Sequence, residues 1–296
     1  MLAASHRGRC RPMLALALAA GEARAPGQGR KVNEWLNHCG DVYARAFSWG
    51  DSHWIHWRGL GVFAFSTGSH QVRVWPESDI QYRSIVDTFS RILQPVILQA
   101  LGWEALHAGA AVAPAGVLAF CGRAGSGKST LAFAMQQAGW KQFADDALVL
   151  RLDQDCVTAC PLPFRPELRP ASRAHFGNAH LPPAQQTQPD VPLVGVFLLK
   201  QDIGLMSPRV SLIQKARAFV ELLAHAHCFD LCDSTHRRRL VDDYLRVAAR
   251  VPIFTLEYQP NFQHLPQLTR AVVEAVTIMD PSADGASELW HAALAP

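Results

Sequence analysis

The chain has 296 residues, of which 49% are hydrophobic and 18% are charged. This composition predicts a globular protein of one or two domains with a substantial core, and it excludes an intrinsically disordered chain. The formal net charge of +3 is too small to indicate a nucleic-acid or membrane partner. Seven cysteines without a disulfide framework indicate reduced thiols and a cytoplasmic protein.

The N-terminal segment is rich in Ala, Arg and Gly and lacks periodicity, which predicts a disordered extension over residues 1–30. Arg7, Arg9 and Arg11 precede the apolar stretch 13–20, an order that also fits a secretory signal peptide. We favour a disordered start over export, because the apolar stretch is short and rich in alanine. No apolar run in the chain approaches the ~20 residues of a membrane-spanning helix.

Residues 31–100 predict a small β-rich subdomain followed by a helix. Three short segments bounded by glycine, with alternating and aromatic character, suggest an antiparallel meander: 53–57, 61–65 and 71–75. From Asp79 to Leu101 apolar residues recur at helical spacing, and Pro95 is expected to break or kink this helix.

Residues 101–285 alternate between strand and helix patterns, which predicts an α/β domain. Strands are expected at 110–112, 117–121, 147–152, 191–200 and 253–258, and helices at 129–138, 211–227, 234–250 and 265–279. The proline-rich stretch 160–192 is expected to be a long irregular segment, and long loops in such folds often carry function.

A phosphate-binding motif lies between the strand 117–121 and the helix 129–138. Its sequence Gly-Arg-Ala-Gly-Ser-Gly-Lys-Ser matches G-x-x-x-x-G-K-[ST], in the strand–loop–helix context that the motif requires. The glycines let backbone N–H groups approach phosphate oxygens, and the helix start adds its positive dipole end. Lys128 is expected to neutralise the β- and γ-phosphates, and the hydroxyl of Ser129 to bind Mg²⁺. The motif thus predicts an ATP site formed by Gly122, Arg123, Ala124, Gly125, Ser126, Gly127, Lys128, Ser129 and Thr130.

A nucleotide site of this kind also needs a carboxylate for the metal and a group that handles the attacking nucleophile. Asp145 and Asp146 are our candidates, since they follow the helix after the loop and precede an apolar strand. The alternatives are a solvated turn at these two residues, and a site at Asp202, which follows the apolar run 193–199.

Three arginines are spaced four residues apart in the proline-rich segment: Arg165, Arg169 and Arg173. The arginine fork suits phosphate oxygens, so these residues could clamp a transferred phosphate or an acidic peptide. The alternative is a solvated face of the loop.

Three features occur in a recognisable order: His107 in the stretch 106–112, the phosphate-binding motif, and the Asp pair in 143–147. This order resembles the catalytic domain of HPr kinase/phosphorylase, and more closely its diverged relatives, the HPr-kinase-like serine kinases. The stretches 161–166 and 250–258 are also similar to the diverged branch, and the resemblance covers about residues 89–276. It implies a P-loop mixed sheet flanked by helices, related to PEP carboxykinase.

The resemblance also implies an activity, namely Mg²⁺-dependent transfer of the γ-phosphoryl group of ATP to a serine-type hydroxyl of a protein or peptide. Asp145 would lie near the nucleophile and Asp146, with Ser129, near the metal, although these two roles could be exchanged. His107 carries over as a catalytic residue near the phosphates; taken alone, it could equally be a core histidine.

The glycine-rich signature of HPr kinase proper, Arg-Gly-Leu-Gly-Ile-Ile-Asn-Val, does not occur in residues 161–199, so HPr is not the expected acceptor. The acceptor stays open, and so does the formation of a homo-oligomer. A small-molecule kinase and a non-catalytic ATP-binding regulatory protein are the alternative functions.

Overall fold

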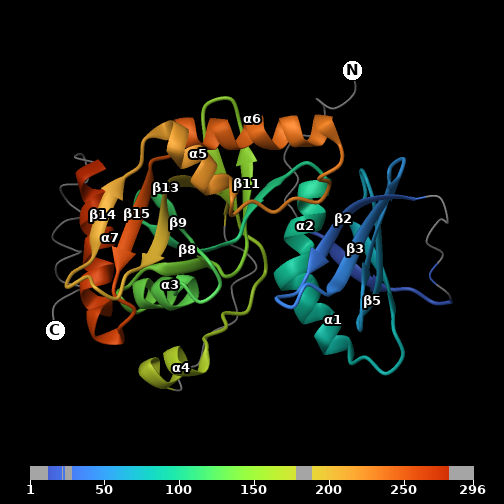
Figure 1. Ribbon diagram of the computed structural model, residues 1–296, viewed down its shortest axis with the longest axis horizontal. Coiled ribbons are helices and arrows are strands. Elements are labelled where there is room, and N and C mark those ends of the chain that lie inside the picture. Colours follow the sequence, from blue (N-terminus) through green and yellow to red (C-terminus); the bar gives the residue numbers. More distant parts are fainter. Residues whose placement is uncertain (1–12, 22, 24–28, 178–188, 280–296) are drawn as a thin grey trace. The chain divides into compact units, whose positions relative to one another are not determined.

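The computed structural model describes residues 13–21, 23, 29–177 and 189–279 (Figure 1). The chain divides into two compact units. The first comprises Met1–Trp103 with Cys228–Arg237, and the second Glu104–His227 with Arg238–Pro296. The division after Trp103 lies close to the boundary expected near residue 100, whereas the return of 228–237 to the first unit was not expected.

The first unit contains one sheet, whose strand order in the described residues is β1-β6-β5-β4-β3-β2. All neighbours pair antiparallel except β1 and β6, which are parallel. Alternate residues such as Phe63 and Phe65 are buried, which is the pattern of a sheet with one covered face. The strands are β1 (Ala15–Leu18), β2 (Arg30–Leu36), β3 (Val42–Trp49), β4 (Ser52–Trp57), β5 (Gly61–Ser66) and β6 (Gln71–Pro76).

Strand β1 falls within the segment that we expected to be disordered. Leu16 and Leu18 pair with Val72 and Val74, so this part of the extension is ordered by the edge of the sheet. Residues 1–12, 22 and 24–28 lie outside the described residues, and with them most of the predicted extension and the arginines of the signal-like pattern.

The helix expected after β6 is present in three pieces: α1 (Tyr82–Thr88), the π-helical turn η1 (Phe89–Leu93) and α2 (Gln94–Ala100). Pro95 lies in the first turn of α2, where its missing N–H breaks no bond of that helix. Ile85, Phe89 and Leu93 belong to the same buried cluster as Ile55 of β4. The helices thus cover the apolar face of the sheet.

Phe229 explains why a distant segment belongs to this unit. Its side chain is buried in the same cluster, and its ring contacts those of His53 and Phe65 at centroid distances of 5.4 and 5.5 Å. Its backbone N–H donates to the side-chain carbonyl of Gln99 at 2.8 Å. The first unit is therefore completed by residues that lie more than a hundred positions later in the sequence.

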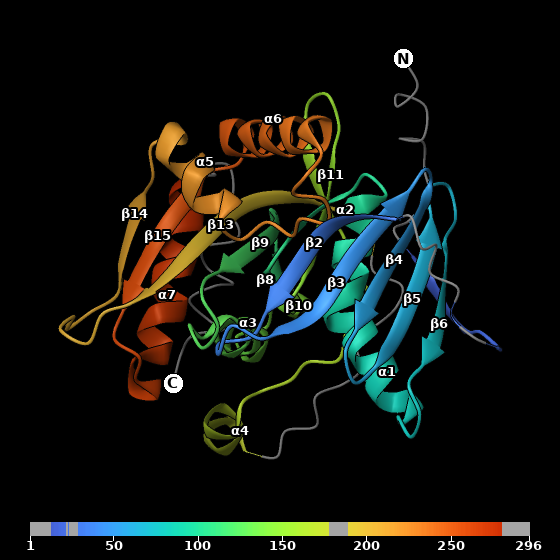
Figure 2. The same cartoon turned by 45° about the vertical axis from the view of Figure 1, so that its right-hand side comes forward.

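The second unit is built on a nine-stranded sheet in the described residues (Figures 1 and 2). Its order is β10-β8-β9-β13-β12-β11-β7, with β15 paired to β13 and β14 to β15. Strands β9, β13 and β15 are mutually parallel, while the other pairs are antiparallel, so the predicted mixed sheet is confirmed. The strands are β7 (Glu104–Leu106), β8 (Ala108–Ala113), β9 (Gly116–Cys121), β10 (Lys141–Ala144), β11 (Leu148–Leu152), β12 (Val157–Cys160), β13 (Val191–Gln201), β14 (Arg209–Leu212) and β15 (Ile253–Tyr258).

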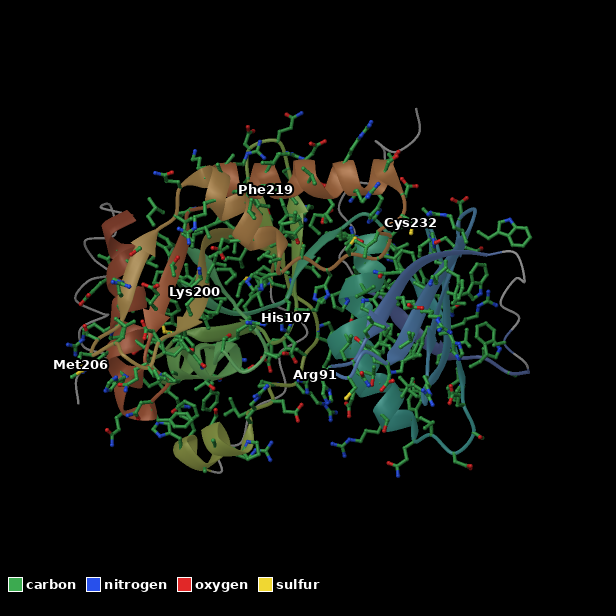
Figure 3. The ribbon with its side chains drawn as sticks, viewed as in Figure 1. Arg91, His107, Lys200, Met206, Phe219 and Cys232 are labelled. Carbon is green, nitrogen blue, oxygen red and sulfur yellow. The ribbon has the colours of Figure 1, made fainter. Side chains whose placement is uncertain are left out.

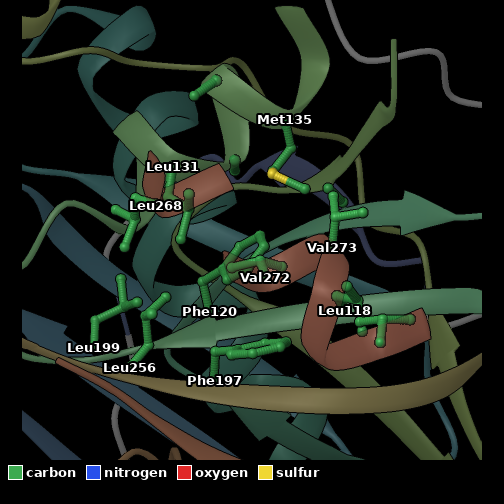
Figure 4. Close-up of a cluster of buried hydrophobic side chains, with 14 of the residues drawn as sticks. Leu118, Phe120, Leu131, Met135, Phe197, Leu199, Leu256, Leu268, Val272 and Val273 are labelled. Atoms are coloured by element: carbon green, nitrogen blue, oxygen red, sulfur yellow. The ribbon is translucent and has the colours of Figure 1, made fainter. Parts of the chain in front are cut away.

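Helices flank this sheet: α3 (Lys128–Gln137), α4 (Pro170–Phe176), α5 (Lys215–Leu223), α6 (Ser234–Arg250) and α7 (Leu265–Met279), with the 3₁₀ turn η2 (Phe262–His264) before α7. Figure 4 shows the main core, in which Leu131 of α3 and Val272 of α7 pack with Phe120 and Phe197 of the central strands. Burial of this apolar surface fixes the start of α3 against the ends of β9 and β13. No helix among the described residues has the length and apolar character needed to cross a membrane.

Two expectations for this unit were wrong in part. Residues 211–227 do not form one helix, because β14 occupies the beginning of the segment and α5 begins only at Lys215. Pairing of Ser211 with Thr255 and of Leu212 with Phe254 at the edge of the sheet overrides the local helical pattern. The proline-rich segment is also not wholly irregular, since it contains α4.

Candidate functional site

The glycine loop, Gly122–Ser129, joins the buried strand β9 to α3, as the sequence predicted. Gly125 and Gly127 both have φ of +86°, a left-handed backbone conformation that residues other than glycine rarely adopt. A Cβ at Gly127 would lie only 2.9 Å from the hydroxyl oxygen of Tyr258, and one at Gly122 would overlap the hydroxyl of Ser126. The loop therefore requires glycine at these positions, because neighbouring protein atoms occupy the space that a Cβ would need.

Lys128 bends back over this loop. Its Nζ donates to the backbone carbonyls of Gly122 at 2.9 Å and of Arg123 at 3.3 Å, and the residue is only 6% exposed. Burial lowers the pKa of Lys128, while the negative charges of Asp146 and Asp145 oppose that change. The ammonium group is thus held at the start of α3, where an anion would also meet the helix dipole.

Ser129 and Asp145 form the closest polar contact at the start of α3. The hydroxyl of Ser129 donates to Oδ1 of Asp145 at 2.7 Å, and Asp145 is 6% exposed. The second oxygen, Oδ2, accepts a hydrogen bond from the backbone N–H of Glu167 at 3.0 Å. A hydroxyl and a carboxylate side by side are oxygen ligands of the kind that Mg²⁺ takes. The structure therefore places Asp145 beside Ser129.

Asp146 has a left-handed backbone conformation, and its carbonyl accepts a hydrogen bond from His107. Its φ is +67°, and its carbonyl oxygen lies 3.0 Å from Nδ1 of His107, the residue between β7 and β8 that is labelled in Figure 3. Because a carbonyl can only accept, Nδ1 must carry the proton. Burial, and then the charge of Lys128, lower the pKa of His107, which favours the neutral ring. His107 thus supports the left-handed turn at Asp146.

Two further histidines lie near His107. The backbone N–H of His107 donates to the carbonyl of His225 at 2.7 Å, and the rings of His107 and His227 meet edge to face at 6.2 Å. Burial lowers the pKa of His227 to about 4, so this ring is neutral at physiological pH. In the described ranges, no group of three or more His, Cys, Asp or Glu side chains is placed to hold a metal ion.

Two residues that the sequence did not indicate contact the other side of the loop. The hydroxyl of Tyr258 donates to the carbonyl of Ser126, and Nε2 of Gln201 donates to the carbonyl of Gly125 at 3.1 Å. Gln201 and Tyr258 are paired at the ends of β13 and β15, both parallel to the strand that leads into the loop. Since ligands bind beyond the carboxyl ends of parallel strands, the ends of these apolar runs were a usable signal.

Of the three arginines in the proline-rich segment, Arg169 is the one that lies against the glycine loop. Its Nη1 is 3.1 Å from the position that a Cβ at Gly125 would take. Arg173 donates to the carbonyl of Leu168 at 3.4 Å, and Arg165 is exposed. Helix α4, which Arg169 precedes, lies beside α3 in both ribbon views (Figures 1 and 2).

Asp202, the competing carboxylate, lies in an exposed turn after β13 and not beside Ser129. It follows β13, is exposed, and its Oδ1 accepts from the backbone N–H of Gly204 at 2.9 Å in the turn before β14. Met206, labelled in Figure 3, lies on the same exposed connection. The structure thus brings Asp145, rather than Asp202, to Ser129.

These residues fit a nucleotide and Mg²⁺. The left-handed backbone at Gly125 and Gly127 is of the kind found in loops whose N–H groups cradle phosphate, and Lys128 supplies a positive charge beside it. Ser129 and Asp145 supply adjacent oxygen ligands for the metal.

No family model and no curated protein matches the chain. Among solved structures, the chain is similar to the HPr(Ser) kinase/phosphatase from Coxiella burnetii, with 13% sequence identity and a TM-score of 0.36. The match covers 62% of this chain and 97% of that one. So distant a likeness carries no argument about activity, which has to be inferred from the residues of the site.

Proposed function

We propose that this chain is an ATP- and Mg²⁺-dependent kinase that transfers the γ-phosphoryl group to a serine-type hydroxyl of a protein or peptide. The contact between Ser129 and Asp145, at the helix start that also carries Lys128, is the observation that supports the proposal best. It unites a metal-binding hydroxyl, a carboxylate and a lysine at the end of one glycine loop. Phosphoryl transfer needs this combination, because its main demands are positioning and charge neutralisation.

Each residue has a proposed role in binding. The backbone N–H groups of the glycine loop and the N-terminus of α3 would hold the phosphates, and Lys128 would neutralise their charge. Ser129 and Asp145 would hold the Mg²⁺, which would neutralise phosphate charge during transfer. This exchanges the two aspartate roles that the resemblance implies, and the contact of Ser129 with Asp145 is the reason.

Asp146 would then serve the acceptor. Among the charges acting on Lys128, that of Asp146 exerts the largest effect, so its carboxylate acts on the region where the γ-phosphate would lie. In the proposed step, the acceptor oxygen forms a bond to the γ-phosphorus, the bond to the leaving ADP breaks, and the hydroxyl proton passes to Asp146. His107 would act as a positioning residue through its hydrogen bond to the Asp146 carbonyl.

The class of acceptor rests on the resemblance of His107, the glycine loop and the aspartate pair to the HPr-kinase-like serine kinases. It can be tested with γ-labelled ATP, Mg²⁺ and an array of serine-containing peptides, using the full chain and its Lys128→Ala variant. The expected result is acid-stable label on a peptide with the wild-type chain and no label with Lys128→Ala. HPr is the negative control, since the glycine-rich signature is absent from residues 161–199.

Other outcomes of this assay point to the other two functions. Label on a small molecule of a cell extract, with none on peptide or protein, would indicate a small-molecule kinase. Tight ATP binding without transfer to any acceptor would indicate a regulatory protein. Absence of ATP binding by the wild-type chain would overturn the nucleotide site itself.

A further inference from the structure

The segment that carries Arg169 is anchored beside the glycine loop on both sides of this residue. Before it, the backbone N–H of Glu167 donates to Asp145 at 3.0 Å. After it, the hydroxyl groups of the buried Ser172 and of Thr130 in α3 share a hydrogen bond of 2.8 Å. The position of Arg169 is therefore set by two contacts with the site, and not by the conformation of an isolated loop.

The guanidinium group of Arg169 rests on the backbone of the loop. Its Nη1 lies 3.1 Å from where a Cβ at Gly125 would be, so a larger residue at Gly125 would displace it. The charge of Arg169 also lowers the pKa of Lys128, although burial and the charges of Asp146, Cys121 and Asp145 have larger effects. Within the described part of the chain, no hydrogen bond or ion pair engages this guanidinium.

Two cations held beside one loop, neither of them in an ion pair with a carboxylate within the described residues, favour an anion between them. The aspartate pair and Lys128 mark the reacting end of the phosphate chain in the proposed function, and the anchor of Arg169 at Asp145 lies at this end. We propose that Arg169 binds the terminal phosphate of the bound nucleotide. This inference rests on the proposed function and adds to it a contact that ADP cannot make.

Arginine is suited to this contact because its planar fork can donate two parallel hydrogen bonds to a phosphate group. An arginine that contacts the transferred group also stabilises the charge of the transition state in other phosphoryl-transfer enzymes. Arg165 and Arg173 do not share this place, since Arg173 is bonded to the carbonyl of Leu168 and Arg165 points to solvent.

The test compares binding of ADP with binding of AMP-PNP, the non-hydrolysable analogue that keeps a terminal phosphate. Calorimetric titration in Mg²⁺ would be made for the wild-type chain, Arg169→Ala, Arg169→Lys and the matched control Arg165→Ala. Arg169→Ala is expected to weaken AMP-PNP roughly tenfold with little change for ADP, since a charge-assisted contact is lost. Arg169→Lys should fall between, because it keeps the charge without the fork, and Arg165→Ala should match the wild type.

Equal losses for the two nucleotides, or none for either, in Arg169→Ala would overturn the assignment of the terminal phosphate to Arg169. So would a selective loss of AMP-PNP affinity in Arg165→Ala with no effect in Arg169→Ala. The proposed function fails separately, if the wild-type chain binds neither nucleotide. Because Arg169 is exposed, its variants are expected to fold, and circular dichroism checks this.

Discussion

The hydroxyl of Ser129 donates a hydrogen bond to the carboxylate of Asp145 across 2.7 Å. The two residues come from different elements, the first turn of α3 and the residue after β10. Their contact joins the glycine loop to the aspartate pair in one site. Asp146 meets the site differently, since its carbonyl accepts from His107 and its charge acts on Lys128.

The first prediction distinguishes the two aspartates by metal dependence. Asp145→Asn should raise the Mg²⁺ concentration needed for half-maximal ATP binding by tenfold or more, since it removes a charged metal ligand. Asp146→Asn should bind Mg²⁺ and ATP nearly as the wild type but lose transfer by about a hundredfold or more. Titration of Mg²⁺ at fixed ATP measures the first effect, and single-turnover transfer measures the second.

Asp202→Asn is the control for this pair, because Asp202 is an exposed turn residue. If Asp202→Asn changes the Mg²⁺ requirement, and Asp145→Asn and Asp146→Asn keep that of the wild type, the metal site has been assigned to the wrong carboxylate. If Asp146→Asn alone changes it, the roles are those that the family resemblance implies.

The second prediction concerns Lys128. Lys128→Ala should abolish detectable ATP binding while it leaves the unfolding temperature within a few degrees, because among the described residues the Nζ bonds only to carbonyls of its own loop. Binding of a fluorescent ATP analogue and thermal unfolding measure the two effects. Lys215→Ala, at an exposed position at the start of α5, is the matched control. Wild-type affinity in Lys128→Ala would refute the phosphate-binding role of the loop.

The third prediction concerns the hydrogen bond from Tyr258 to the carbonyl of Ser126. Burial raises the pKa of Tyr258, so its phenol is protonated and able to donate at neutral pH. Tyr258→Phe leaves that carbonyl without its donor, which costs about 1 kcal/mol and should weaken AMP-PNP binding by several-fold. The exposed Tyr82, changed to Phe, is the control in the same titration. Unchanged affinity in Tyr258→Phe would show that the bond does not order the loop.

The fourth prediction is a pH dependence of stability that arises at Glu104. Burial raises the pKa of Glu104 from 4.5 to about 8, an effect that the charge of Arg239 at 3.5 Å only partly opposes. Between these two values the folded chain keeps a proton that the unfolded chain has released. Stability should therefore fall as the pH rises from about 4.5 to about 8, and this contribution should be constant above that.

Glu104→Gln keeps the shape of the side chain but cannot ionise, so its unfolding temperature should fall less between pH 5.5 and 8.5 than that of the wild type. Thermal unfolding at a series of pH values measures the difference. The control is Glu274→Gln, at an exposed position on α7, which should follow the wild type. Parallel curves for Glu104→Gln and the wild type would contradict the protonated state of Glu104.

The sequence alone determined the local parts of this site. The fully apolar run 117–121 predicts a buried strand, and the glycine pattern with its helix formers predicts the loop and α3, because each rests on the conformational preference of neighbouring residues. The alternating segments of the first unit were predictable for the same reason. The position of the aspartate pair after the helix made it a candidate, but the sequence did not indicate which residues the two aspartates contact.

The tertiary structure decided which residues meet. Ser129 reaches Asp145, Tyr258 reaches Ser126 and Phe229 returns to the first unit through sheet order and packing across long stretches of chain. These pairings depend on the free energy of burying whole faces of strands and helices, which no local pattern contains. For the same reason, the start of the expected helix 211–227 forms part of β14, because its backbone groups make hydrogen bonds with the edge strand β15. The chemistry of the loop is therefore local, while its partners are set by the fold.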